Sequence, residues 1–246
     1  DLTASFEGAF GSLPTPDFDP EMITKVIDFK PMVYRSTMVA PSFDTIVEVN
    51  ICRTVPGMKN NTQASFSGFL LAAILNDKDN YIQQKARKLG ASQLTFKYEL
   101  YNFSGKLTAV TNANPDSWQE VTSWVDAELQ RADQTLVNES MMNMGKLLFR
   151  REFTLLTKTV EYPEWVARFW VNDDGGYVPA LLDSVLSIDE HDLRNYAVDY
   201  LRQNPACIVL KINDDLKSLL KIDSVYPPLD ESVFNYVFKY RQNVTN

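Results

Sequence analysis

The segment at residues 69–75, FLLAAIL, constrains the fold most strongly, because it is apolar on nearly every side of a helix. Apolar residues at helical spacing extend the predicted helix over residues 64–76. Such a helix is stable only when it is buried. The chain of 246 residues can supply the necessary core. A fold of this size buries roughly 70–75% of its extended-chain surface.

Extended patterns lie on both sides of this helix. Residues 28–38 and 44–55 predict two neighbouring strands joined at Ala40-Pro41-Ser42, and the second alternates apolar and polar residues. Residues 92–110 alternate about Ser104-Gly105. They predict a hairpin whose even-numbered positions face the core.

Helical patterns fill most of the remaining chain. Residues 77–89 predict an amphipathic helix that ends at Gly90 in a left-handed cap position. Another helix is expected after Pro115. Residues 137–186 then predict three helices, interrupted near Pro163 and at 173–176.

A capped helix and a strand complete the order. Ser187 followed by Glu190 has the capping-box spacing and predicts the start of a helix over residues 190–201. Residues 206–212 are apolar and predict a final strand. Paired strands followed by a long helical block predict an α+β fold, with a two-layer antiparallel sheet covered by helices on one face.

Three regions are expected along the chain. Residues 28–222 form the predicted α+β domain. Residues 1–27 contain several proline and aspartate breakers and predict a linker or arm. Residues 223–246 depart from the preceding pattern and predict a C-terminal extension, either an edge strand or the start of a further domain.

Charge and hydropathy limit the classes of partner. The formal net charge is −8 and the isoelectric point is near 4.8. Duplex binding needs concentrated Lys and Arg, so a nucleic-acid partner is not expected. No apolar run approaches the length of about 18 residues that a membrane span needs.

The two cysteines, Cys52 and Cys207, both lie in strand-like segments. They are too few for a zinc knuckle or a disulfide framework. Two buried reduced thiols are the expected arrangement, because free cysteine behaves as a small hydrophobe. A single bridge requires the two strands to be neighbours, which the sequence leaves open.

The only histidine, His191, limits the chemistry available to the chain. Zinc hydrolysis uses at least three protein ligands and a general base, usually with two histidines on one helix. Neither His-Glu-x-x-His nor His-x-x-Glu-His occurs. We therefore predict no catalytic residue, metal site or cofactor within this chain, and an exposed first-turn position for His191. An unrelated enzyme that uses clustered carboxylates in a cleft stays an alternative.

Several segments, in their order and spacing over residues 28–213, together resemble one half of a pitrilysin, insulinase or mitochondrial-processing-peptidase type zinc metallopeptidase. The resemblance implies the LuxS/MPP-like metallopeptidase-half fold. It rests on residues 45–51, 69–75, 83–92, the hairpin 95–111, the helix after Pro115 and residues 186–201.

In that family two halves close around an extended peptide, and one half has lost the zinc motif. This chain is similar to the half without zinc. The resemblance implies a non-catalytic domain that pairs with a zinc-bearing half or subunit, as a homo- or hetero-dimer, and encloses a polypeptide. The alternative is a stand-alone protein-binding scaffold or assembly factor that keeps the fold without a role in proteolysis.

The resemblance also implies where substrate would be held. Such halves often carry an Arg four residues before a Gly and a Tyr three residues after it. Relative to Gly90, this sequence has Ala86 and Gln93 there. The nearby Arg87 is the one substrate-binding residue that we predict.

The compartment is left open by the sequence. Because the chain begins at Asp1 without Met, it is expected to be a mature product or a piece of a longer protein. If a signal sequence precedes Asp1, the bacterial periplasm or cell envelope is the expected location.

Overall fold

The computed structural model describes residues 36–41, 46–58, 61–101, 104–172, 177–202, 204 and 206–220. The predicted arm at 1–27 and the predicted extension at 223–246 lie outside these residues. The described elements fall within the predicted domain at 28–222, whose boundaries stay a prediction.

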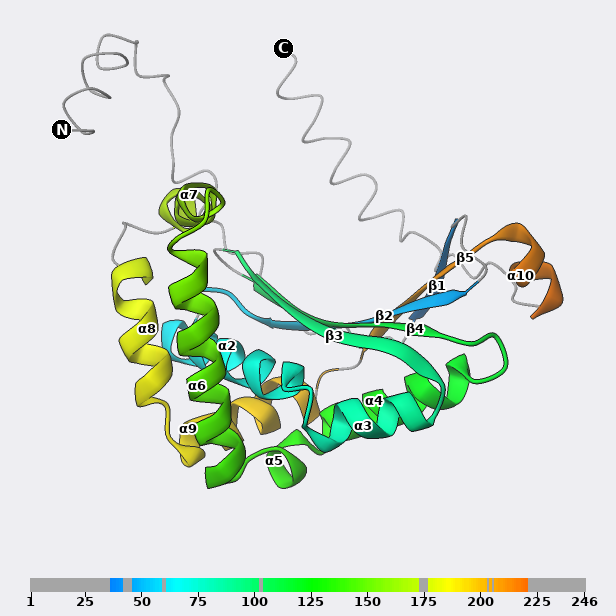
Figure 1. The fold of residues 1–246 in the computed structure, drawn as a ribbon, viewed down its shortest axis with the longest axis horizontal. Helices are drawn as coiled ribbons and strands as arrows, with labels where there is room; N and C mark the ends of the chain where they lie inside the picture. The colour runs from blue at the N-terminus through cyan, green and yellow to red at the C-terminus, as the bar shows by residue number, and fades with distance from the viewer. Residues whose placement is uncertain are drawn as a thin grey trace, which may run out of the picture. The chain divides into compact units, whose positions relative to one another are not determined.

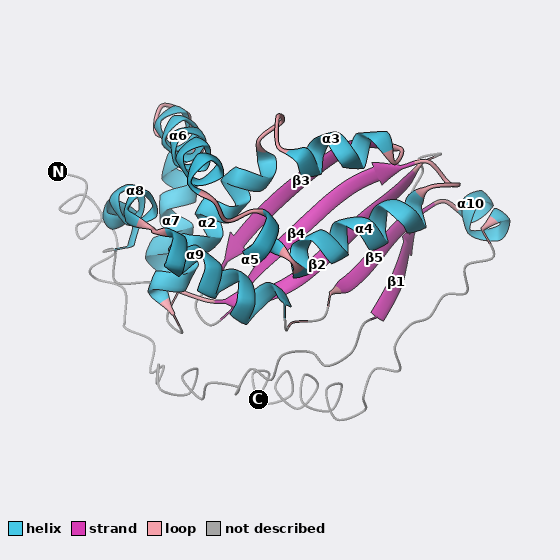
Figure 2. Ribbon diagram, turned by 90° about the horizontal axis from the view of Figure 1, so that it is seen from below, coloured by secondary structure: helices cyan, strands magenta, loops and turns pink. Residues whose placement is uncertain are grey.

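Five strands form one sheet within the described residues, in the order β1-β5-β2-β4-β3 (Figure 1). The strands are β1 Ser36–Pro41, β2 Val47–Pro56, β3 Ala91–Leu100, β4 Ser104–Ala113 and β5 Cys207–Ile212. The four strands β5, β2, β4 and β3 are antiparallel, and β1 is parallel to β5. Helices lie over one face of this sheet (Figure 2), which confirms the predicted α+β class.

Strand β2 confirms the second predicted strand. Of the first, predicted at 28–38, only residues 36–38 are described, and they belong to β1, which continues through Ala40 and Pro41 where the connection was predicted. The prediction that the two strands are neighbours is wrong. Strand β5 lies between β1 and β2, parallel to the first and antiparallel to the second. Parallel strands need a long crossover connection, and the intervening helices supply it here. A local pattern cannot show that the end of the domain inserts beside its beginning.

The predicted hairpin is confirmed as β3 and β4, with one correction. Even-numbered residues face the core on β3, as Leu94 and Phe96 do, but odd-numbered residues face it on β4. The register pairs Tyr98 with Leu107, so residues that share a face differ in parity. The turn closes where the Tyr101 N–H donates to the Ser104 carbonyl at 2.9 Å.

The three helices predicted within residues 137–186 are confirmed as α6, α7 and α8. The described helices are α2 Thr62–Asn76, α3 Tyr81–Lys88, α4 Trp118–Gln130, α5 Ala132–Thr135, α6 Glu139–Leu156, α7 Tyr162–Asn172, α8 Tyr177–Ser187, α9 Glu190–Tyr196, the π-helix η2 Ala197–Arg202 and α10 Asp214–Leu219. Gly90 follows α3 with φ of 102°, as its predicted cap position requires.

The helix predicted to start at residue 190 is confirmed, but its capping residue is not Ser187. The N-cap of α9 is Asp189, whose carboxylate accepts from the Asp192 N–H at 2.8 Å. The Asp192 carboxylate in turn accepts from the Asp189 N–H. The two bonds form a capping box that begins two residues later than predicted. Asp and Ser are both favoured at N-cap positions, because the side chain of each accepts a hydrogen bond from a free N–H group of the first turn.

Helix α2 is buried from both sides, as its sequence predicted. It packs on the sheet through β2, β3 and β4, and its other sides contact α6, α8 and α9. Leu70, Leu71 and Leu75 are fully buried. Gly145 of α6 lies so close to Ile74 that an added Cβ would overlap its side chain, which explains a glycine inside this helix.

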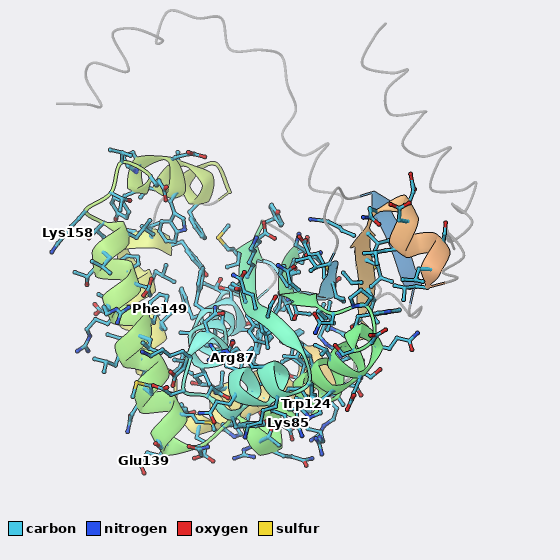
Figure 3. All side chains as sticks on the ribbon, turned by 45° about the vertical axis from the view of Figure 1, so that its right-hand side comes forward. Lys85, Arg87, Trp124, Glu139, Phe149 and Lys158 are labelled. Atoms are coloured by element: carbon cyan, nitrogen blue, oxygen red, sulfur yellow. The ribbon has the colours of Figure 1, made fainter. Side chains whose placement is uncertain are left out.

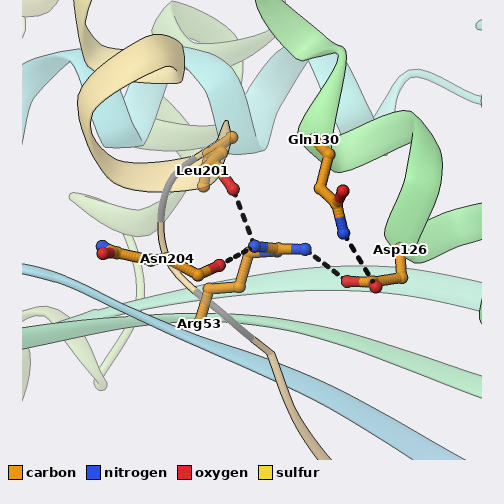
Figure 4. Close-up of polar contacts among 5 residues, drawn as sticks. All are labelled: Arg53, Asp126, Gln130, Leu201 and Asn204. Carbon is orange, nitrogen blue, oxygen red and sulfur yellow. Dashed lines mark hydrogen bonds and ion pairs between the residues drawn. The ribbon is translucent and has the colours of Figure 1, made fainter. Parts of the chain in front are cut away.

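A buried arginine joins the sheet to the helical layer (Figure 4). The Arg53 side chain is 0% exposed on the helix-facing side of β2 and forms an ion pair with Asp126 of α4. Its guanidinium also donates to the carbonyl of Leu201 at 2.7 Å and to that of Asn204. Gln130 donates to the second carboxylate oxygen of Asp126 at 3.1 Å. One side chain therefore connects β2, α4 and the end of η2.

We expect Arg53→Met to lower the free energy of unfolding by roughly 3–5 kcal/mol, because it removes the ion-pair partner of the buried Asp126 carboxylate. Urea denaturation followed by circular dichroism measures this loss. The double variant R53M/D126L should be more stable than the sum of the two single losses predicts, by about 1 kcal/mol or more.

Arg151 provides the matched control, since it forms a largely exposed pair with Glu152. Arg151→Met should cost less than about 1 kcal/mol. Equal losses for R53M and R151M would contradict the role assigned to the buried pair.

Candidate functional site

A groove of about 810 Å³ lies between the edge strand β3 and helices α2, α3 and α6. Strand β3 is last in the described sheet, so one of its sides faces this groove instead of another described strand. Helix α3 and helix α6 supply opposite walls. Figure 3 marks Arg87 and Lys85 on α3 and Phe149 on α6.

Arg87 lies at the rim of the groove, on the last turn of α3. Its side chain is exposed, whereas Ile82 and Ala86 of the same helix are buried.

Two polar side chains attach the start of α3 to the end of α2. Asn80 donates to the Ile74 carbonyl at 3.1 Å, and Gln83 donates to the Leu75 carbonyl at 2.7 Å.

The positions that the sequence analysis compared around Gly90 lie in different environments. Gln93 lines the groove together with Arg87, next to an irregularity in the β3–β4 register. Ala86 is fully buried in the core and cannot contact a ligand. The predicted binding residue Arg87 is thus placed on a concave surface, while its role stays a prediction.

Aromatic rings form much of the groove floor. Phe69 of α2 contacts Tyr98 of β3 edge to face, with ring centroids 4.9 Å apart, and lies 5.9 Å from Phe149. Gly68 of α2 leaves the space that the Tyr98 ring occupies, because an added Cβ would overlap it. The Tyr98 hydroxyl is buried, and burial raises the pKa of this tyrosine well above its usual value.

Asn76 occupies part of the β3 edge. Its side-chain amide donates to the Phe96 carbonyl at 2.7 Å and accepts from the Phe96 N–H at 2.8 Å. These two bonds imitate those of a neighbouring strand. An extended peptide that pairs with β3 at Phe96 would have to displace this amide.

Charges of both signs surround the apolar floor. Arg87, Lys78 and Arg151 line the groove along with Asp77, Asp79 and Glu152. Glu152 pairs with Arg151 at 3.2 Å, and Asp77 accepts from the Asp79 N–H at 3.1 Å. The groove therefore combines an apolar floor with charged side chains of both signs.

His191 is exposed in the first turn of α9, where the sequence placed it. Its Nε2 lies 3.0 Å from the Asn195 side-chain amide. Within the part of the chain that the structure describes, no three His, Cys, Asp or Glu side chains group closely enough to hold a metal ion. Among the same residues, no helix has the length and hydropathy to cross a membrane.

Sequence patterns did not identify the residues that shape the groove. Asn76, Tyr98 and Phe149 come from three elements that are distant in the chain. Asn76 had one local signal, since it is a polar residue directly after an apolar run. The pairing with Phe96 depends on how α2 lies on the sheet, and no local pattern encodes that.

No family model and no curated protein matches the sequence. Solved structures do match. A protease from Helicobacter pylori has a TM-score of 0.61 at 15% identity, over 86% of this chain and 52% of that chain. An M16-like peptidase from Alicyclobacillus acidocaldarius has a TM-score of 0.58 at 14% identity, over 73% of this chain and 43% of that chain.

A third match is a chain of complex III2 from Candida albicans, with a TM-score of 0.60 at 10% identity, over 78% of this chain and 47% of that chain. The chain thus spans about half the length of these structures. At such low identity the likeness shows the fold alone, which is that of an M16-like peptidase half.

We expect Asn76→Ala to increase hydrogen exchange at the Phe96 amide, because this amide loses its acceptor. The free energy of unfolding should fall by about 1–2 kcal/mol, as two hydrogen bonds are lost. Exchange measured by NMR or mass spectrometry tests the local effect, and urea denaturation tests the global one.

Gln84→Ala is the control, since Gln84 is an exposed residue of α3 with one hydrogen bond to the Asp79 carbonyl. It should change stability by no more than about 0.5 kcal/mol. Undiminished protection of the Phe96 amide in N76A would show that the Asn76 side chain does not occupy the strand edge.

Proposed function

We propose that this chain is a non-catalytic, peptidase-like domain that pairs with a zinc-bearing half or subunit and helps to enclose a polypeptide. The observation that carries the proposal is an M16-like half fold in a chain with one histidine. A zinc motif with two histidines cannot be assembled from such a chain, so a second polypeptide segment would supply the metal centre.

The lengths of the matched structures support pairing. This chain covers 52% of the H. pylori protease and 43% of the A. acidocaldarius peptidase. The remainder of such a molecule would come from another domain or subunit.

The groove beside β3 is the surface that we assign to the polypeptide. Arg87 at its rim carries donors that suit backbone carbonyls and carboxylates. The aromatic floor gives contact area without selecting one sequence. This combination favours a broad preference for extended chains over recognition of a single motif.

The first test is a peptidase assay on the isolated chain, with and without added zinc. We expect no cleavage in either condition, because this polypeptide supplies only His191 as an imidazole ligand. Zinc-dependent cleavage that copurifies with the folded monomer and is lost in H191A would overturn the assignment as a non-catalytic domain.

The second test concerns Arg87. Binding of a fluorescein-labelled unfolded polypeptide, such as reduced and carboxymethylated lysozyme, is measured by fluorescence anisotropy. We expect Arg87→Ala to weaken binding about 3- to 10-fold, the loss typical of one ordinary hydrogen bond.

Lys85→Ala is the matched control, because Lys85 is an exposed cation on the same helix that does not line the groove. The two variants change the net charge equally. K85A should alter the affinity by less than about two-fold. Equal losses would indicate general electrostatic attraction and would remove Arg87 from the proposed site.

The alternative is a stand-alone scaffold or assembly factor that binds another protein without serving proteolysis. The match to a chain of complex III2 favours it, since that chain is part of a complex. Affinity purification from the native source followed by cross-linking mass spectrometry discriminates the two. Cross-links from the groove to a zinc-peptidase homologue support the first proposal, and cross-links to a structural protein support the second.

A further inference from the structure

The two cysteines of the chain lie directly opposite each other on neighbouring strands. Cys52 of β2 and Cys207 of β5 are partners in the antiparallel register. Both are thiols and both are half-buried. The sequence separates them by most of the domain, so only the insertion of β5 beside β2 brings them together.

On β2 and β5, the side chains of register partners contact each other. Glu48 and Lys211 are partners in the same register, and they form an ion pair of 2.7 Å that lowers the pKa of Glu48. Side chains two residues apart on a strand share a face. Cys52, four residues from Glu48, therefore lies on the same face as this ion pair, and Cys207 lies on it four residues from Lys211.

The spacing between register partners suits a disulfide. Directly opposed residues of antiparallel strands have Cβ atoms about 4.5–5.5 Å apart. A disulfide needs Cα atoms about 4.4–6.8 Å apart and Cβ atoms about 3.5–4.5 Å apart. A small movement of the two side chains toward each other is therefore enough for the disulfide to form.

The surroundings of the pair slow its reactions without enclosing it fully. The face that carries both cysteines is opposite to the helix-facing residues Ile51 and Ile208, which are buried. Thr108 of β4 donates to the Cys52 sulfur at 3.7 Å. Burial raises the pKa of Cys52, which slows its reaction with oxidants at neutral pH.

We propose that Cys52 and Cys207 are a redox modification site, which closes to an intramolecular disulfide in the presence of a low-molecular-weight disulfide such as oxidised glutathione. A thiolate of one cysteine attacks a sulfur of oxidised glutathione and releases one glutathione thiolate, which leaves a mixed disulfide. The second cysteine then attacks the protein sulfur of that mixed disulfide and releases the other glutathione.

Bonds and electrons balance between the protein cysteines and glutathione. Two protein S–H bonds and the glutathione S–S bond break, while one protein S–S bond and two glutathione S–H bonds form. Two electrons pass from the protein to glutathione disulfide, and the protein protons end on the two glutathione thiols. The product links β2 to β5 covalently and encloses the chain from α2 to η2 in one loop.

The experiment uses the full folded chain, incubated with oxidised glutathione, quenched by alkylation and analysed without reduction. We expect the whole-protein mass to fall by about 2 Da. A tryptic digest should contain one linked pair, formed by the peptides 36–53 and 203–211, which end at Arg53 and Lys211.

Cys52→Ser and Cys207→Ser are the matched variants. In each variant the reaction should stop at a mixed disulfide, which adds about 305 Da for one glutathione. Persistence of both thiols in the folded wild type would overturn the proposal, provided the urea-unfolded chain is oxidised by the same reagent. Stable glutathione adducts on both cysteines, or dimers linked between chains, would also overturn it.

Discussion

Burial of α2 between the sheet and other helices is the constraint on which the other parts of the structure depend. This helix lies between the sheet and the helices α6, α8 and α9, so each layer packs against it. Gly68 gives room for Tyr98 on the sheet side, and Gly145 gives the close approach of α6 to Ile74 on the other. The groove beside β3 exists because α3 and α6 form its opposite walls and Phe69 of α2 forms part of its floor.

Charged side chains complete the attachment of the helical layer. Arg53 reaches from β2 to Asp126 and to two backbone carbonyls, and Arg202 of η2 forms an ion pair with the buried Asp133 of α5. Burying a charge is costly unless it is paired and hydrogen-bonded, so such contacts tolerate few alternative arrangements. We infer that they fix the position of η2 and the entry into β5 more than they add stability.

The two faces of the sheet carry different chemistry. On the helix-covered side lies the groove beside β3, with aromatic side chains and charges of both signs, to which we assign the polypeptide in our proposal. On the opposite face, Glu48 pairs with Lys211 and Cys52 lies opposite Cys207. Polypeptide binding and redox chemistry, as proposed, therefore use separate surfaces, and each can be tested by substitutions that leave the other intact.

The sequence by itself determined the local elements, and its single histidine leaves no zinc motif with two histidines. The apolar run of α2, the alternation in β2 and the breakers between α6, α7 and α8 depend on neighbouring residues, and they were predictable for that reason. The tertiary structure alone decided that β5 lies between β1 and β2, that Arg53 is buried against Asp126, and that Asn76 binds the edge at Phe96. These contacts join residues far apart in the chain, and their energies depend on packing that no local pattern records.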